Sequence, residues 1–299
     1  MESNYFCIGG HNICLQFSDT KANSMELLPS FVTFCLEDCP QNLLFTLTVD
    51  DSLRPMKERK LVRKFDTGNG DTVVYQLPDG GYQYIIRDIH NRDCCLLICN
   101  KDFSQNQCAL NGDWVMRSFG LNDALMLIYA FAGSFHQTLL IHASCILLRP
   151  QEPGEEAVAY PFTAKSGTGK STHSSLWMKH IEGAELLNDD NPIIRLIDGK
   201  PYIFGSPWSG KTPCYRNVQA RLGAVTLIDR APRNSIERLG PVQAFATLLP
   251  ACSSMKWDGP IYNSLCDCLT HIIETTPVYT LHCLPDEEAA VLCHHTITQ

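Results

Sequence analysis

The 299-residue chain is predicted to be an α/β protein in which a β-rich N-terminal domain, residues 1–118, precedes an α/β domain, residues 119–299. Three observations predict this organisation. Short β-branched and aromatic runs dominate the first part. Helix and strand patterns mix irregularly in the second part, which favours a mixed sheet flanked by helices over a regular doubly wound sheet. A glycine-rich turn there joins a strand pattern to a helix pattern.

The first part contains several short runs with the composition of β-strands, separated by turn sequences such as Asp79-Gly80-Gly81. The predicted strands are Tyr5–Ile8, Asn12–Phe17, Leu43–Val49, Thr72–Leu77 and Tyr82–Ile86. No catalytic pattern occurs in this region. Two interpretations remain open for it: an accessory domain that shapes a substrate entrance or mediates self-association, or a purely structural domain.

The second part begins with a mostly apolar helix over 121–135, too short to span a bilayer. Strand patterns and two further helices then follow in an order that is not strictly alternating. The predicted strands are 139–145, 157–162, 186–187, 192–197, 202–205, 222–228 and 278–284, and the helices are 172–181 and 286–293. Asp198-Gly199 predicts a tight hairpin turn between two of these strands.

The glycine-rich turn is the most informative motif of the chain. It runs from Ala164 to Thr172, and only its second half matches the pattern G-x-x-x-x-G-K-[ST] strictly, because Ala164 stands where the first glycine usually is. Backbone N–H groups in such a turn bind phosphate oxygens, and the following helix directs the positive end of its dipole at the anion. The predicted nucleotide-binding residues are Ser166, Gly167, Thr168, Gly169, Lys170, Ser171 and Thr172.

Within this motif, Gly167 and Gly169 allow positive φ angles and a close approach of the backbone to the ligand. Lys170 is expected to reach the β- and γ-phosphates of ATP, and the Ser171 hydroxyl is expected to bind Mg²⁺. The alternative interpretation is a glycine-rich turn that binds no ligand.

Two further elements flank the motif. An apolar run ends in Asp189 and Asp190, at a position where α/β folds collect ligand-binding side chains. One aspartate could bind Mg²⁺ while the other accepts a proton. The alternative is a solvated turn, because the sequence Asp-Asp-Asn-Pro is also typical of turns. Upstream, His142 lies in an apolar run, where a histidine is more often a core residue than a catalyst.

The order His-Ala, Ser-Gly-Thr-Gly-Lys-Ser, Asp-Asp resembles the HPr kinase/phosphorylase and phosphoenolpyruvate carboxykinase superfamily over about residues 138–297. The resemblance implies a mixed-sheet nucleotide-binding domain of that type. It also implies that His142, Lys170 and Asp189 are catalytic, with Asp189 as the base, and that Ser171 and Asp190 bind the metal. The chain is most like the small HPr-kinase-like proteins that accompany peptide-modification systems. The Arg-Gly-containing loop with which HPr kinases engage their protein substrate is not found.

The segment from Gly205 to Lys211 resembles a segment that lies beside the active site in those small proteins. Its two glycines and Trp208 could form a lid over a substrate, and Lys211 and Arg216 could neutralise a transferring phosphoryl group. An ordered turn with Trp208 packed into the core is the alternative.

Composition and net charge restrict the classes of partner that the protein is expected to bind. The net charge of −8 and the pI of about 5.7 argue against nucleic-acid and anionic-membrane surfaces. The N-terminal residues have no secretion-signal pattern, and no apolar run is long enough to span a bilayer, so a cytoplasmic protein is expected. The fifteen cysteines lack paired Cys-x-x-Cys spacing, which favours reduced, mostly buried thiols over disulfides or zinc ligands.

Together these observations predict an ATP- and Mg²⁺-dependent kinase that phosphorylates a hydroxyl, with serine or threonine of a protein or peptide as the expected acceptor. Two other classes stay open: a non-catalytic nucleotide-binding regulator, and a lyase of the carboxykinase kind. Self-association is also left open.

Overall fold

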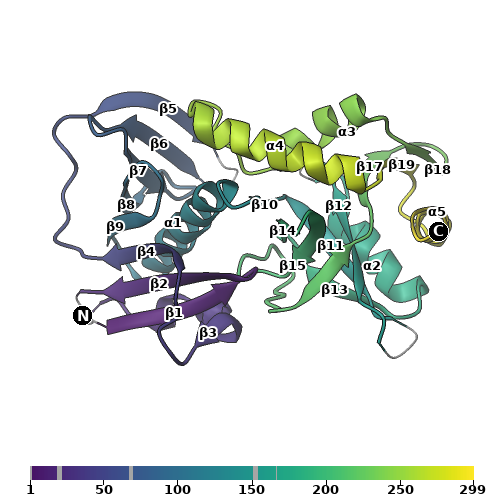
Figure 1. The fold of residues 1–299 in the computed structure, drawn as a ribbon, viewed down its shortest axis with the longest axis horizontal. Helices are drawn as coiled ribbons and strands as arrows, with labels where there is room; N and C mark the ends of the chain where they lie inside the picture. The colour runs from purple at the N-terminus through teal and green to yellow at the C-terminus, as the bar shows by residue number, and fades with distance from the viewer. Residues whose placement is uncertain (1, 19–21, 67–69, 151–153, 166) are drawn as a thin grey trace. The chain divides into compact units, whose positions relative to one another are not determined.

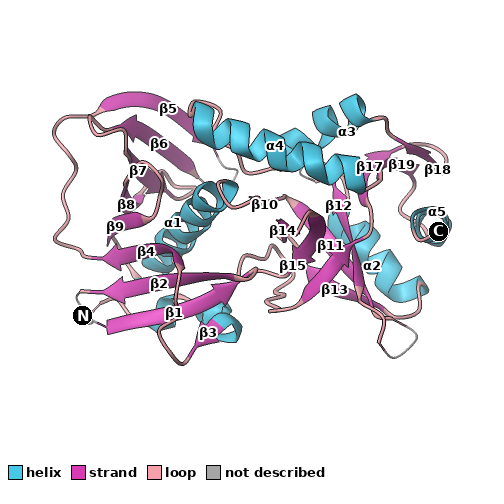
Figure 2. Cartoon of the chain, in the orientation of Figure 1, coloured by secondary structure: helices cyan, strands magenta, loops and turns pink. Residues whose placement is uncertain are grey.

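The computed structural model describes residues 2–18, 22–66, 70–150, 154–165 and 167–299. The chain divides into two compact units, residues 1–133 and 134–299 (Figure 1). It is an α/β protein with two large mixed sheets, one in each unit, and strands outnumber helices among the described elements (Figure 2). The expected mixed sheet in the second part is therefore confirmed.

The first unit is built on a nine-stranded sheet with the order β3-β1-β2-β4-β9-β8-β7-β6-β5. The β2–β4 and β4–β9 pairs are parallel, and the other pairs are antiparallel. All five predicted strands are present, whereas β3, β5, β8 and β9 were not predicted. The strands are β1 Glu2–Ile8, β2 His11–Phe17, β3 Cys35–Leu36, β4 Leu43–Val49, β5 Lys60–Asp66, β6 Asp71–Gln76, β7 Tyr82–Arg87, β8 Asp93–Cys99 and β9 Gln105–Leu110. Two short 3₁₀ helices, η1 Met25–Leu27 and η2 Pro29–Phe34, precede β3.

The helix α1, Trp114–Ser134, packs against this sheet. The Tyr129 hydroxyl donates to the Ile8 carbonyl over 2.8 Å, and the rings of Phe103 and Phe131 are 5.4 Å apart. The helix begins seven residues before the predicted 121–135 because it continues through Gly120, where a Cβ would lie 2.9 Å from Cβ of Cys95. The glycine lets the helix approach β8, and the predicted boundary at residue 118 falls inside α1.

The second unit has a ten-stranded sheet with the order β10-β14-β15-β16-β12-β17-β19-β18, in which β11 pairs with β12 and β13. Parallel pairs join β12 to β16 and β17, and β17 to β19. The strands are β10 Thr138–Leu140, β11 Ala143–Leu148, β12 Val158–Thr163, β13 Ala184–Asn188, β14 Ile193–Ile197, β15 Lys200–Phe204, β16 Gln219–Leu222, β17 Val225–Arg230, β18 Ser235–Arg238 and β19 Val278–Cys283.

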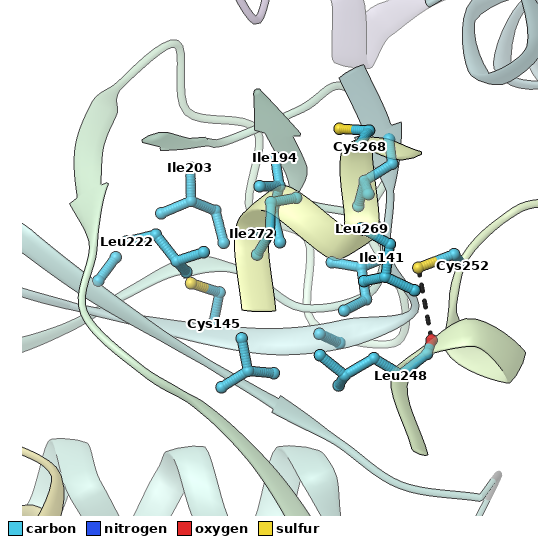
Figure 3. Close-up of a cluster of buried hydrophobic side chains, with 14 of the residues drawn as sticks. Ile141, Cys145, Ile194, Ile203, Leu222, Leu248, Cys252, Cys268, Leu269 and Ile272 are labelled. Atoms are coloured by element: carbon cyan, nitrogen blue, oxygen red, sulfur yellow. Dashed lines mark hydrogen bonds between the residues drawn. The ribbon is translucent and has the colours of Figure 1, made fainter. Parts of the chain in front are cut away.

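Helices cover this sheet in two groups, each with its own apolar core. The helices α2 (Lys170–His180) and α5 (Glu287–Ile297) pack together around Trp177. The helices α3 (Pro241–Leu248) and α4 (Gly259–Thr275), with the short η3 (Leu249–Ala251), enclose the other core. Figure 3 shows that core, in which Leu269 and Ile272 of α4 meet strand residues such as Cys145 and Ile194.

The structure differs locally from the predicted elements at three places. The run 139–145 is interrupted at Ile141 and His142, so β10 and β11 are separate strands. The predicted strand 222–228 is divided at Gly223, where a Cβ would lie 2.5 Å from the Tyr160 ring. The helix α4 was missed because its first residues, Gly259-Pro260, are typical of turns, yet proline is well suited to the first turn of a helix.

None of the helices in the described part of the chain combines the length and apolar character that crossing a membrane requires.

Candidate functional site

The strand pairing of the second unit places the three predicted site elements at the same end of three neighbouring strands. The strand β11 runs antiparallel to β12 and β13, with Ala143 opposite Thr163 and Cys145 opposite Asn188. The start of β11 therefore lies beside the ends of both neighbours. His142 precedes β11, the glycine-rich turn follows β12, and the two aspartates follow β13.

The glycine-rich turn has the backbone that its sequence predicts. Gly167 and Gly169 have φ angles of 77° and 129°, and an added Cβ at Gly167 would meet no atom within 4 Å. These glycines are thus needed for backbone conformation rather than for space. The helix α2 starts at Lys170, with Ser171 and Thr172 exposed on its first turn. Ser166 lies outside the described residues.

His142 is held between a carboxylate and the loop lysine. Its Nδ1 lies 2.9 Å from Oδ1 of Asp190, and its Nε2 lies 2.8 Å from Nζ of Lys170. With Asp190 ionised, Nδ1 carries the proton and donates it, so Nε2 is the acceptor for the Lys170 ammonium. The side chain of His142 is 44 % exposed, which differs from the core histidine of the alternative interpretation.

Lys170 is half-buried, and this burial lowers the pKa of its ammonium group. The carboxylates of Asp190 and Asp189 act in the opposite direction and favour the charged form. The lysine is therefore a partly desolvated cation whose nearest counter-charges are the two aspartates. A phosphate group could compete with them for this cation.

Asp189 is the more buried of the two aspartates, at 5 % exposure. Its Oδ1 accepts a hydrogen bond from the Ser144 hydroxyl over 2.8 Å, and Ser144 in turn accepts one from the Ser174 hydroxyl over 2.7 Å. Its Oδ2 accepts no hydrogen bond from any residue that the structure describes. A buried carboxylate oxygen without a donor is costly, so this atom marks a place where a cation would be stabilised.

Asn188 fixes the turn that carries the two aspartates. Its side-chain oxygen accepts from the N–H groups of Asp190 and Asn191, both over 2.9 Å. Its amide nitrogen donates to the Ser206 hydroxyl over 3.2 Å and to the Trp208 carbonyl over 3.1 Å. The turn after β13 and the segment 205–211 are therefore tied together at one asparagine.

The segment 205–211 lies directly against the aspartates. A Cβ at Gly210 would be 2.8 Å from the Asp189 carbonyl oxygen, and at Gly205 it would be 2.0 Å from the Arg216 carbonyl oxygen. Both glycines thus permit close packing. Trp208 is buried, as in the alternative interpretation of this segment.

Of the two predicted phosphate-clamp residues, Arg216 is engaged away from the aspartates. Arg216 binds Glu185 over 3.0 Å and the Leu186 carbonyl over 2.7 Å, near the beginning of β13 rather than its end. Arg149 and Arg216 together lower the pKa of Glu185, the Arg149 hydrogen bond being the largest cause. Lys211 is exposed.

Sequence reasoning missed several residues that shape the site. Arg230, at the end of β17, donates to the carbonyl oxygens of Thr168 (2.8 Å) and Gly167 (2.7 Å) and so holds the loop from the side. Ser144 was missed because a single serine in an apolar run carries no pattern, and Ser174 because nothing in the sequence distinguishes it from the neighbouring serines and threonines of its helix. Asn188 had a usable signal, because asparagine before a turn often binds the backbone that follows.

The donor set fits Mg²⁺ bound together with a nucleotide. No cluster of three or more His, Cys, Asp or Glu side chains suited to a metal occurs among the described residues. Mg²⁺ is commonly held by one or two carboxylates with phosphate oxygens and water, so a complete protein cage is not required. The Ser171 hydroxyl and the orphaned oxygen of Asp189 are oxygen donors of the kind that Mg²⁺ prefers.

No protein-family model matches the chain. No curated protein matches its sequence at a significant level.

Proposed function

We propose that the second unit is an HPr-kinase-like, ATP-dependent kinase that transfers a phosphoryl group to a serine or threonine hydroxyl of a protein or peptide. The observation that carries this proposal is that Lys170, His142 and Asp190 form one hydrogen-bonded chain. Lys170 lies 28 residues after His142 in the sequence and 20 residues before Asp190. A glycine-rich turn without a ligand has no need of such an arrangement.

The nucleotide phosphates would lie on the loop. The first turn of α2 supplies free N–H groups and the positive end of the helix dipole, and the two positive-φ glycines orient the loop backbone. Lys170 would leave His142 and bind the β- and γ-phosphates. Its partial burial supports this exchange, because a phosphate stabilises the desolvated ammonium more than a neutral imidazole does.

The exchange would free Nε2 of His142 to accept a proton. Asp190 holds the imidazole in the tautomer whose Nε2 is unprotonated. As the acceptor hydroxyl oxygen bonds to the γ-phosphorus, the bond to the β,γ-bridging oxygen breaks, ADP leaves, and the hydroxyl proton passes to Nε2. Positioned proton acceptors of this kind contribute about 10² to 10⁴ in rate.

The division of roles between the aspartates proposed here is the reverse of the one that the resemblance implies. Both oxygens of Asp190 have partners, namely His142 Nδ1 at 2.9 Å and Asn191 Nδ2 at 2.8 Å, whereas Oδ2 of Asp189 has none among the described residues. We therefore assign Asp189 and Ser171 to the metal, and Asp190 to His142. Bound Mg²⁺ would neutralise charge on the phosphates during transfer.

The test is transfer of labelled γ-phosphate from ATP to a degenerate peptide library with one central serine. Wild-type protein is expected to label the peptides in a Mg²⁺-dependent way, and Lys170→Ala to lose labelling. Lys179→Ala removes an exposed lysine of the same helix and should behave as wild type. Nucleotide binding without transfer would indicate a regulator instead, and nucleotide-dependent conversion of oxaloacetate would indicate a lyase; either result contradicts the kinase proposal.

A further inference from the structure

The strand β5 forms one edge of the nine-stranded sheet in the first unit, where β6 is its only neighbour among the described strands (Figure 1). Its residues are exposed except Val62 and Phe65, which are half-buried, and Leu61 is 59 % exposed. An edge strand carries a row of backbone N–H and C=O groups that pair with no strand of its sheet. Such an edge can take up an additional extended segment, which supplies the missing hydrogen bonds.

The chain is strongly basic at this edge. Six of the eleven residues 54–64 are lysine or arginine and one is acidic, so the segment carries a formal charge of +5 in a chain of net charge −8. All six basic residues are exposed. Nζ of Lys64 lies 2.6 Å from Oδ2 of Asp71 on β6. Among the described residues, neither Lys57 nor Lys60 forms an ion pair or a side-chain hydrogen bond, so both ammonium groups can bind a partner.

The residues that lead into β5 are held against the sheet. The Met56 N–H donates to Oε1 of the fully buried Gln83 over 2.8 Å. The guanidinium of Arg59 donates to the Met56 carbonyl and lies 5.1 Å from the centre of the Tyr75 ring. A partner would therefore meet an ordered surface, and binding would cost less conformational entropy than binding to a free loop.

The charge of the edge determines which kind of strand can pair with it. A second copy of the chain, paired edge to edge, would bring two basic β5 strands together, and like charges on neighbouring strands are destabilising. The bulge between Leu61 and Arg63 also disfavours such pairing. A strand with aspartate or glutamate side chains would instead form opposite-charge pairs. A nucleic acid would be attracted by the same charge but would not satisfy alternating backbone N–H and C=O groups.

We propose that the outer edge of β5 is a docking site for an acidic peptide segment, which binds in an extended conformation as an additional strand. Backbone hydrogen bonds to β5 would give affinity, and carboxylates beside the lysines would give selectivity for acidic sequences. Exposed apolar side chains at Met56 and Leu61 would contact apolar residues between the carboxylates. The proposal concerns the first unit and does not depend on the function proposed for the second.

The probe is a fluorescent ten-residue peptide in which glutamate alternates with valine, titrated with the full chain and followed by anisotropy. A lysine–valine peptide reverses the charge. A glutamate–proline peptide keeps the acidic charge but lacks half of the N–H groups that a strand needs. A single-stranded thymidine oligonucleotide tests nucleic-acid binding.

The glutamate–valine peptide should bind, with an affinity that falls as salt is added, and each of the other three probes should bind about tenfold more weakly or not at all. Absence of binding by the glutamate–valine peptide would overturn the proposal, and the basic residues would then serve only to protect the edge. Equally tight binding of the glutamate–proline peptide or of the oligonucleotide would also overturn it, because neither can add a regular strand.

Charge reversal at the edge tests the location. The double variant Lys57→Glu/Lys60→Glu should bind the glutamate–valine peptide about tenfold more weakly, because repulsion replaces attraction at two positions. Lys101→Glu is the matched control, since Lys101 is an exposed lysine of the same unit that lies outside β5, and it should bind as wild type. Melting temperatures would verify that both variants fold. Equal affinities of the two variants would contradict the assignment to β5.

Hydrogen exchange tests whether the peptide adds a strand. Its binding should slow the exchange of backbone amides within Lys60–Asp66, because amides of the outer edge gain hydrogen-bond partners. Amides of Cys35–Leu36, in the strand β3 at the opposite edge of the sheet, should exchange as before. Unchanged exchange in β5 with bound peptide, or slower exchange at β3 instead, would overturn the proposed site.

Discussion

Each unit contains an aspartate that is surrounded by polar groups, Asp51 in the first and Asp189 in the second. The two differ in how many of their carboxylate oxygens accept hydrogen bonds. In the first unit, Asp51 accepts from Arg117 (2.8 Å), from Asn23 (3.0 Å) and from the Leu110 N–H (2.9 Å), which engages both carboxylate oxygens. In the second unit, Asp189 has one oxygen bonded to Ser144 and the other without a described donor.

The Asp51 carboxylate is fully hydrogen-bonded within the protein, whereas Asp189 is the aspartate that we propose to bind the metal ion. The Asp51 cluster joins residues as far apart as Asn23 and Arg117, and its donors and acceptors balance within the protein. In the Asp189 cluster, one carboxylate oxygen has no donor among the described residues. An unsatisfied buried carboxylate is costly for folding, so its presence beside a phosphate-type loop points to function.

The largest expected effect is on phosphoryl transfer. Asp189→Asn should lower the transfer rate by about 10² to 10⁴ and weaken Mg²⁺-dependent nucleotide binding, because it removes a metal ligand. Asp190→Asn should slow transfer but leave Mg²⁺·ATP binding nearly unchanged, because it acts through His142. Calorimetry with a non-hydrolysable ATP analogue, with and without Mg²⁺, distinguishes them. The opposite pattern would restore the roles that the family resemblance implies.

A smaller effect is expected on the pH dependence of stability. Burial lowers the pKa of His173 to about 4, so its neutral form stabilises the fold fully above the unfolded-state value near 6.5. This stability, about 3 kcal/mol, should be lost as the pH falls from about 6.5 to about 4. Urea unfolding of wild type and His173→Phe at several pH values would measure it. A slope that is equal in both proteins would remove His173 as the cause.

The smallest expected effect is on the free energy of unfolding, and it concerns Asp51, whose two carboxylate oxygens both accept hydrogen bonds. Asp51→Asn should lower the free energy of unfolding by about 2 kcal/mol, because an amide N–H then faces the donors of Arg117 and Asn23. The same substitution at Asp189 should change it by less than about 0.5 kcal/mol, since no hydrogen bond is lost. The Asp51→Asn substitution should leave the affinity for Mg²⁺·ATP unchanged. Equal destabilisation at both positions would show that the two clusters are alike in kind.

The sequence predicted the site elements better than their surroundings. His142 and Asp190 each lie within two residues of a strand end, and Lys170 begins the helix that follows the turn after β12. Strand ends and helix starts of this kind can be recognised from apolar runs and turn residues. The roles of Ser144 and Arg230 depend on pairings between distant strands, which no local pattern encodes. The start of α1 and the division at Gly223 were missed because the glycines there serve close packing, which a single sequence does not distinguish from turn formation.

The central claim, that the loop of the second unit binds a Mg²⁺·nucleotide, is tested most directly by calorimetric titration of the full chain with a non-hydrolysable ATP analogue. Wild-type protein should bind the analogue, more tightly with Mg²⁺ than without it. Lys170→Ala should bind at least tenfold more weakly, and Lys179→Ala should match wild type. Absence of measurable binding to wild-type protein at millimolar analogue and Mg²⁺, or equal binding by Lys170→Ala, would contradict the account.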